Sequence, residues 1–199
     1  HKLYKELLNF CSLDLSAFYF DIRKDILYCD DLKSPKRLIC INLLGLILDL
    51  LLKWFAPILS FTTEEIYQIL NEEEKSSIHL ENFPTIPAEW ENQEIFQKWE
   101  KLKIVRNVAN AAIEIKRSRK DIGSSLEANV QIYLGKEYLK LVKDVDLSEY
   151  LITSKASAKP MINDDKFFKL DEVENVKVVV EKASGEKCSR CWKILENPC

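Results

Sequence analysis

A chain of 199 residues can form one good-sized core, or one core with a smaller satellite. Hydrophobic residues make up 47% and charged residues 31%, the balance of a folded protein rather than a disordered one. The four glycines stand far apart, so no Gly-rich loop can wrap a nucleotide phosphate. With only two histidines as well, the chain is not expected to be a self-contained nucleotide enzyme.

The charges are unevenly distributed along the chain. The net charge of −3 argues against nonspecific coating of nucleic acid. Residues 62–94 hold nine acids and one lysine, a balance of −8, whereas residues 98–120 hold eight bases and two acids, a balance of +6. This asymmetry indicates either a directional electrostatic surface or a solvated helix with a chance excess of charge.

The first two predicted elements are helices. Over residues 3–28, apolar residues recur at helical spacing, at Leu3, Leu7, Cys11, Leu15, Phe18 and Ile22. The Ser34-Pro35 pair begins a second helix, which Pro57 ends after Phe55. This second helix is apolar enough to raise the question of a membrane, but Asp49 and Lys53 lie within it and would be costly in lipid. We expect a central helix, buried on most sides, and no membrane contact.

Two further helices precede a change of pattern. Residues 63–70 form the third, with Thr62 or Thr63 as its cap. Residues 88–120 form a long helix whose apolar face is Ile95, Trp99, Leu102, Ala109 and Ala112. Four or five helices with short connections predict a bundle.

Beyond Gly123 the pattern predicts a small α/β region. Residues 128–134 alternate as a half-buried strand does, and residues 150–153 and 176–180 are further strand candidates. Residues 138–142 can form a short helix. The predicted organisation is a mainly α chain with a helical bundle over 1–122, a mixed α/β subdomain over 123–184 and a cysteine tip over 185–199.

The strongest chemical motif lies at the C-terminus and reads Lys187-Cys188-Ser189-Arg190-Cys191-Trp192. Two cysteines separated by two residues form a knuckle that aims both sulfurs at one point, as a tetrahedral zinc site requires. Cys199 adds a third thiolate, and we expect a fourth ligand from a second knuckle completed beyond residue 199. A redox pair would need a βαβ context that the pattern lacks; a thiol tail without structure is the other alternative. We expect zinc in the intact protein and leave open whether this chain alone retains it.

The end of the long helix carries four bases, Lys116, Arg117, Arg119 and Lys120. They can satisfy the last carbonyls of the helix and the negative end of its dipole. They can also contact phosphates, each adding affinity that falls with salt. Together with the +6 balance of residues 98–120, which includes Arg106, the cluster favours RNA contact.

Four strings, at residues 15–28, 56–67, 120–128 and 187–192, occur in an order and spacing that span nearly the whole chain. They resemble the C-terminal anticodon-binding region of bacterial-type isoleucyl-tRNA synthetases. The last string, the zinc motif, separates the isoleucyl family from its valyl and leucyl relatives. The sequence departs from the family pattern at Ser60, usually proline, at Tyr67, often tryptophan, and at Ile26, commonly arginine, where we place no RNA contact.

The resemblance implies a class Ia anticodon-binding bundle, a small α/β region and a zinc tip. It implies binding to the anticodon stem-loop of isoleucine tRNA, with Arg190 and Trp192 near the anticodon; Trp192 either stacks on a base or covers the zinc site. The family's signature strings for activating isoleucine with ATP, and its editing domain, are not among these residues.

We therefore expect catalysis, and ATP binding, in another body of the same polypeptide, and no catalytic competence in this chain by itself. The intact protein is expected to be a cytoplasmic monomer. The alternatives are a stand-alone helical protein-interaction module with a zinc clip, the matching region of a valyl- or leucyl-type synthetase, and a thiol enzyme that uses Cys188 and Cys191.

Overall fold

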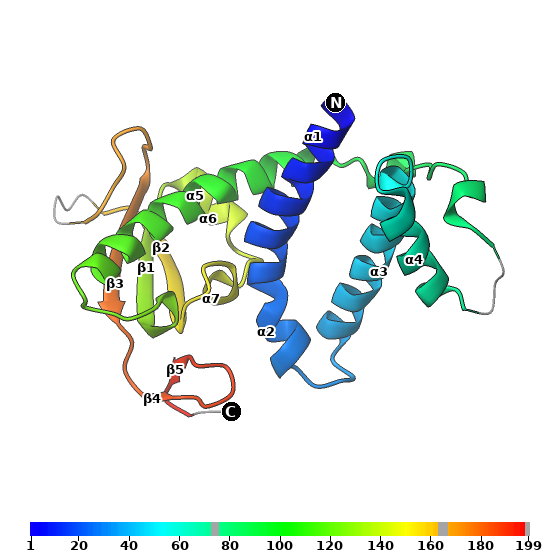
Figure 1. Cartoon of the computed structure of the whole chain (residues 1–199). Helices are drawn as coiled ribbons and strands as arrows, with labels where there is room; N and C mark the ends of the chain where they lie inside the picture. The colour runs from blue at the N-terminus through cyan, green and yellow to red at the C-terminus, as the bar shows by residue number, and fades with distance from the viewer. Residues whose placement is uncertain (73–75, 163–166, 198–199) are drawn as a thin grey trace. The chain divides into compact units, whose positions relative to one another are not determined.

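The computed structural model describes residues 1–72, 76–162 and 167–197, and the chain divides into two compact units (Figure 1). Unit 1 comprises His1–Asp25 and Asn92–Cys199, and unit 2 comprises Ile26–Glu91. The chain is mainly α-helical and carries one small mixed sheet, which confirms the predicted class.

A continuous helix opens the chain in unit 1, and its last four residues, 26–29, belong to unit 2. It consists of α1 (Lys2–Asn9), the π-helical segment η1 (Phe10–Phe20) and α2 (Asp21–Cys29), which confirms the helix predicted over 3–28. The π-helical segment has more residues per turn than an α-helix, so residues at α-helical spacing do not all stay on one face. Accordingly, Leu7, Leu15 and Ile22 are buried, whereas Cys11 and Phe18 are half-buried.

The core of unit 1 forms between α5 (Gln93–Ser118) and the sheet. The side-chain oxygen of Asn92 caps α5 by accepting a hydrogen bond from the Ile95 amide at 3.0 Å, so the long helix begins later than the predicted residue 88. Residues 88–90 form a separate 3₁₀ turn, η3 (Ala88–Trp90). The buried side of α5 consists of Leu102, Val105, Val108, Ala109, Ala112 and Ile113.

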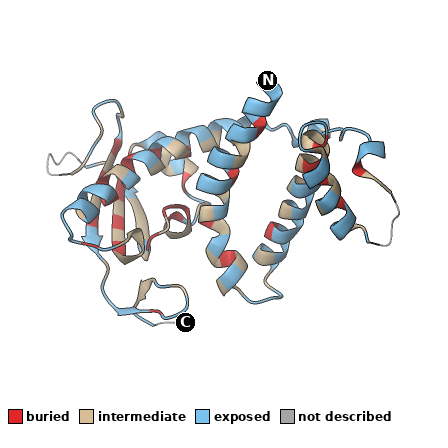
Figure 2. Cartoon of the chain, viewed as in Figure 1, coloured by how far each residue is buried: buried red, intermediate tan, exposed pale blue. Residues whose placement is uncertain are grey.

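The sheet has the strand order β2-β1-β3. The central strand β1 (Ala128–Leu134) pairs in parallel with β2 (Lys155–Pro160) and antiparallel with β3 (Val176–Lys182). Both strands predicted at 128–134 and 176–180 are confirmed. In Figure 1, α5 lies over this sheet, and in Figure 2 buried residues mark both.

The boundary predicted after residue 122 lies within unit 1, because the helix before it and the strand after it share one core.

Short elements complete unit 1. The helix predicted at 138–142 is α6 (Lys136–Leu141), and η4 (Ser125–Glu127) precedes β1. The strand predicted at 150–153 is wrong, because residues up to 150 form the helix α7 (Leu147–Tyr150). The Asp146 carboxylate caps this helix by accepting hydrogen bonds from the amides of Ser148 and Glu149, at 3.0 and 3.1 Å. The C-terminal tip is a hairpin of β4 (Glu186–Lys187) and β5 (Ile194–Leu195).

Unit 2 contains α3 (Pro35–Phe55), α4 (Ser60–Leu70) and η2 (Ile78–Leu80). Its small core consists of Leu52, Ala56, Tyr67 and Ile78. The predicted threonine cap of α4 is wrong: the helix begins at Ser60, which places Thr63 inside the first turn, where its hydroxyl donates to the Leu59 carbonyl at 3.0 Å.

The helix α3 is not buried on most sides, contrary to the prediction. Only Cys40 and Leu52 are buried along it, and its exposed apolar residues include Leu38, Ile39, Ile41, Leu43, Leu46 and Leu48. Within unit 2, α4 packs against only one part of it. By length and composition alone α3 could cross a membrane, which is weak evidence because a core helix of a soluble protein passes the same test.

Candidate nucleic-acid interface

At the basic end of α5, main-chain amides donate hydrogen bonds to carbonyls of the last helical turn. The Lys120 amide donates to the Arg117 carbonyl at 2.9 Å, and the Asp121 amide donates to the Lys116 carbonyl at 3.0 Å. With Lys120 in the left-handed region at φ 62°, these bonds form a Schellman motif. The Ser118 hydroxyl donates to the Ile115 carbonyl at 2.9 Å. The four basic side chains are therefore not needed to satisfy these carbonyls.

Two of these four bases form ion pairs close to the helix. Lys116 lies 3.0 Å from Asp121, and Arg117 lies 2.6 Å from Glu114. These side chains are 36–63% exposed, so each pair contributes little to stability and can open at little cost. Arg119 and Lys120 are exposed and form no ion pair among the residues that the structure describes. The end of α5 thus presents two uncompensated positive charges and two weakly compensated ones.

Arg106 does not lie with the other predicted bases. It is located three turns earlier on α5, where the guanidinium lies 5.0 Å from the centre of the Phe18 ring and 5.6 Å from that of Tyr150. It also pairs with Asp21 at 3.8 Å, and only 12% of its side chain is exposed. In this position Arg106 joins α5 to the N-terminal helix and to α7, a structural role that the sequence did not predict.

The tip presents an exposed aromatic ring. Trp192 is 62% exposed, with φ 63°, and its amide donates to the Cys188 carbonyl at 2.9 Å. The ammonium group of Lys187 lies 6.0 Å from the centre of the indole ring, and Arg190 is exposed in the turn beside it. A largely exposed ring can stack on a base.

The two knuckle cysteines lie in one turn of the C-terminal hairpin. Cys188 is buried and its amide donates to the Lys193 carbonyl at 2.8 Å, while Cys191 is half-buried in the same turn. Two thiols on one turn of a hairpin suit zinc, which takes four ligands in structural sites. The described residues contain no group of three or more potential metal ligands, and the predicted third ligand, Cys199, lies outside them.

Comparison with known proteins identifies the family. Residues 1–134 match the family model described as the anticodon-binding domain of tRNA ligase. The chain belongs to this family. It is 50% identical over its full length to the isoleucine–tRNA ligase of Pelagibacter ubique, of which it spans 21%. It is also 42% and 44% identical, each over 96% of its length, to those of Rhodopseudomonas palustris and Bradyrhizobium diazoefficiens.

These matches confirm the resemblance to isoleucyl-tRNA synthetases over the anticodon-binding part. The chain spans about a fifth of the length of these relatives. The matches favour an isoleucyl-type synthetase over a valyl- or leucyl-type one and over a stand-alone interaction module.

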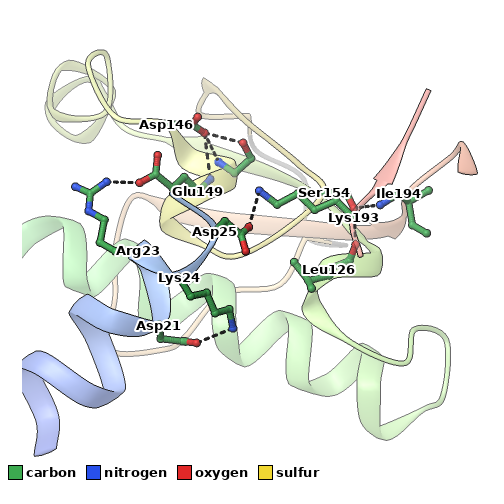
Figure 3. A network of polar contacts seen from close by, with 11 residues as sticks. Asp21, Arg23, Lys24, Asp25, Leu126, Asp146, Glu149, Ser154, Lys193 and Ile194 are labelled. Carbon is green, nitrogen blue, oxygen red and sulfur yellow. Dashed lines mark hydrogen bonds and ion pairs between the residues drawn. The ribbon is translucent and has the colours of Figure 1, made fainter. Parts of the chain in front are cut away.

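The sequence did not predict the polar contacts that join distant segments of this anticodon-binding chain. Arg23 on α2 pairs with Glu149 on α7, and Asp25 on α2 pairs with Lys193 in the tip at 3.2 Å (Figure 3). These four residues are charged, as many residues on protein surfaces are, so no local sequence pattern distinguishes them from residues without such a partner.

Proposed function

We propose that this chain is the tRNA-recognition part of an isoleucine–tRNA ligase, the enzyme that attaches isoleucine to its tRNA with ATP. The family match and the full-length similarity to isoleucine–tRNA ligases support this proposal. In it, the chain binds the anticodon stem-loop of isoleucine tRNA and performs no chemistry, while the rest of the same polypeptide binds ATP. The intact enzyme acts in the cytoplasm as a monomer.

The observation that carries the RNA contact is the basic end of α5. The carbonyls of residues 115–117 are satisfied by main-chain donors and the Ser118 hydroxyl, yet Arg119 and Lys120 extend from it without ion pairs among the described residues. Phosphate oxygens are the partners that such a cluster favours, because each neutralised phosphate releases counterions. Lys116 and Arg117 add two contacts once they exchange their exposed carboxylates for phosphates.

The proposed tip contact differs in kind. Trp192 stacks on an unpaired anticodon base, and Arg190 contacts the backbone beside it. The exposure of the indole supports stacking over a role as cover for the metal. We propose that zinc, bound by Cys188, Cys191, Cys199 and a later residue, holds this turn together.

Metal analysis tests the zinc proposal. We expect stoichiometric zinc in the intact enzyme and weak or no zinc in residues 1–199 alone, because structural zinc closes at four ligands. Equally tight zinc in both would show that residues 1–199 already hold a complete ligand set.

Salt-dependent filter binding of isoleucine tRNA to the intact enzyme tests the RNA contact. The test variant is Arg119→Glu with Lys120→Glu, and the matched control is Lys140→Glu with Lys143→Glu, which changes the net charge equally at other exposed lysines. We expect the test variant to lower the slope of log affinity against log salt by about 1.5 or more, and the control to lower it much less. Equal slopes for the test variant and the unaltered enzyme would show that the basic end is only a solvated helix end.

A further inference from the structure

We infer that Asp25 and Ser154 are positioning residues, which hold the C-terminal tip, residues 186–195, in a fixed orientation against the rest of unit 1. The inference rests on the proposed function, because the orientation matters if the tip and the basic end of α5 bind one RNA. It assigns a role in tRNA recognition to two residues that need not touch the tRNA.

The tip requires support from outside itself. Its two strands are two residues long, and a hairpin of this size has no core to stabilise it. Cys188 is the one buried residue among 186–195. The approach of the strands is close: a Cβ atom at Gly185, where φ is 128°, would lie 2.4 Å from the Leu195 carbonyl oxygen.

The first support is an ion pair to the N-terminal helix. The Lys193 ammonium lies 3.2 Å from the Asp25 carboxylate, and these side chains are only 19% and 27% exposed. Partial burial makes the pair less subject to screening by salt than the exposed pairs of α5. The helix that carries Asp25 is itself joined to α7 by Arg23 and Glu149, so the tip is tied to a fixed element.

The second support is a hydrogen-bonded bridge through Ser154, drawn in Figure 3. The Ile194 amide donates to the Ser154 hydroxyl at 2.6 Å, and that hydroxyl donates to the Leu126 carbonyl. Ser154 directly precedes β2, and Leu126 lies just before β1. The bridge therefore fastens β5 to one end of the sheet.

Both supports act directly after Trp192. Because Lys193 pairs with Asp25 and the Ile194 amide is bonded to Ser154, the main chain that carries the indole is fixed at its C-terminal side. On its N-terminal side, the Trp192 amide is held by the Cys188 carbonyl. The supports thus set where the ring lies relative to α5, which belongs to the same unit.

The first test needs no tRNA. Hydrogen exchange of the amides of residues 186–195 is measured in the intact enzyme for Asp25→Asn and for Ser154→Ala. Exchange should become about three- to tenfold faster in each, the effect of losing one net interaction of this kind. Glu137→Gln, which removes the exposed ion pair with Lys101, is the matched control and should leave the tip unchanged. Unchanged exchange in both test variants would overturn the inference, whatever the tRNA binding shows.

The second test measures positioning in tRNA binding. If Asp25 acts through the tip, Asp25→Asn and Trp192→Ala together should weaken binding less than the product of their separate effects. Asp25→Asn combined with Lys120→Ala should be multiplicative. The exchanged pair Asp25→Lys with Lys193→Asp should restore both tip protection and affinity to within about threefold of the unaltered enzyme.

Faster exchange together with multiplicative effects for Trp192 would show that Asp25 is only structural. Normal binding in the single variants Trp192→Ala and Lys120→Ala would contradict the proposed function, while hydrogen exchange still decides the docking of the tip.

Discussion

Replacement of Lys120 by glycine should make the protein more stable and its tRNA binding weaker. Lys120 is in the left-handed region at φ 62°, which costs a residue other than glycine about 1–2 kcal/mol. Glycine removes that cost but loses about 0.4–1 kcal/mol through the greater freedom of the unfolded chain. The net gain lies between about 0 and 1.6 kcal/mol, and its midpoint of about 0.8 kcal/mol corresponds to a rise in Tm of about 2–3 °C for a chain of 199 residues.

The same substitution removes one proposed phosphate contact. One charge contributes about 0.7–0.9 to the slope of log affinity against log salt. If the contact contributes nothing at 1 M salt, affinity should fall about tenfold at 50 mM and about three- to fourfold at 200 mM. Weaker tRNA binding by a more stable protein would show that the affinity is lost with an RNA contact and not through a general loss of structure.

Thermal denaturation of residues 1–199 and filter binding of isoleucine tRNA to the intact enzyme provide the two measurements. Asn175→Gly is the backbone control, because Asn175 also has a positive φ, of 63°, but is uncharged and precedes β3 rather than ending α5. It should leave the salt slope unchanged. Lys120→Asn removes the charge and keeps a residue that tolerates this conformation, so its salt slope should match that of Lys120→Gly. Lys120→Gly with an unchanged slope would refute the phosphate contact, and a lower Tm would refute the reasoning from backbone strain.

Three further predictions concern the core and the tip. The Tyr150 hydroxyl is buried and has no hydrogen-bond partner among the described residues, and burial raises its pKa to about 12. Because Tyr150→Phe removes a buried hydroxyl without breaking a hydrogen bond, the variant should keep or slightly raise the Tm at pH 8. Because the pKa of Tyr150 is higher in the folded than in the unfolded protein, the unaltered protein should lose stability as pH rises from about 10 to 12. The Tyr150→Phe variant should lose less stability over this range, and thermal melts at pH 8 and 11 measure the difference. Cys188→Ser with Cys191→Ser should leave the helical circular dichroism largely intact, because the long helices lie outside the tip; loss of most of the signal would contradict this. Trp192→Ala should cost about 1–3 kcal/mol of tRNA binding in the intact enzyme with little change in salt slope, and a changed slope would indicate loss of charge contacts instead of stacking.

The pattern of single segments predicted most of the fold, because helix and strand periodicity is a property of neighbouring residues. The strand at 128–134 is marked by alternation, and Val130, Ile132 and Leu134 are indeed completely buried. The pattern did not mark β2, because its residues Lys155–Pro160 form a polar edge strand whose pairing is decided by β1. It misassigned Tyr150, whose ring packs beside Trp99, 5.6 Å between centres, at the end of a capped helix.

The sequence by itself marked the residues to which we assign the proposed contacts: the four bases ending α5 and the knuckle with Trp192. The tertiary structure alone decided how they are held. It placed the guanidinium of Arg106 beside the rings of Phe18 and Tyr150, and it left Arg119 and Lys120 exposed. The pairs of Lys116 with Asp121 and of Arg117 with Glu114 are local contacts, three to five residues apart at the helix end. The tertiary structure also joined Arg23 to Glu149 across 126 positions of the chain. The packing of segments so distant in sequence depends on the burial of the whole core, and no local periodicity records it.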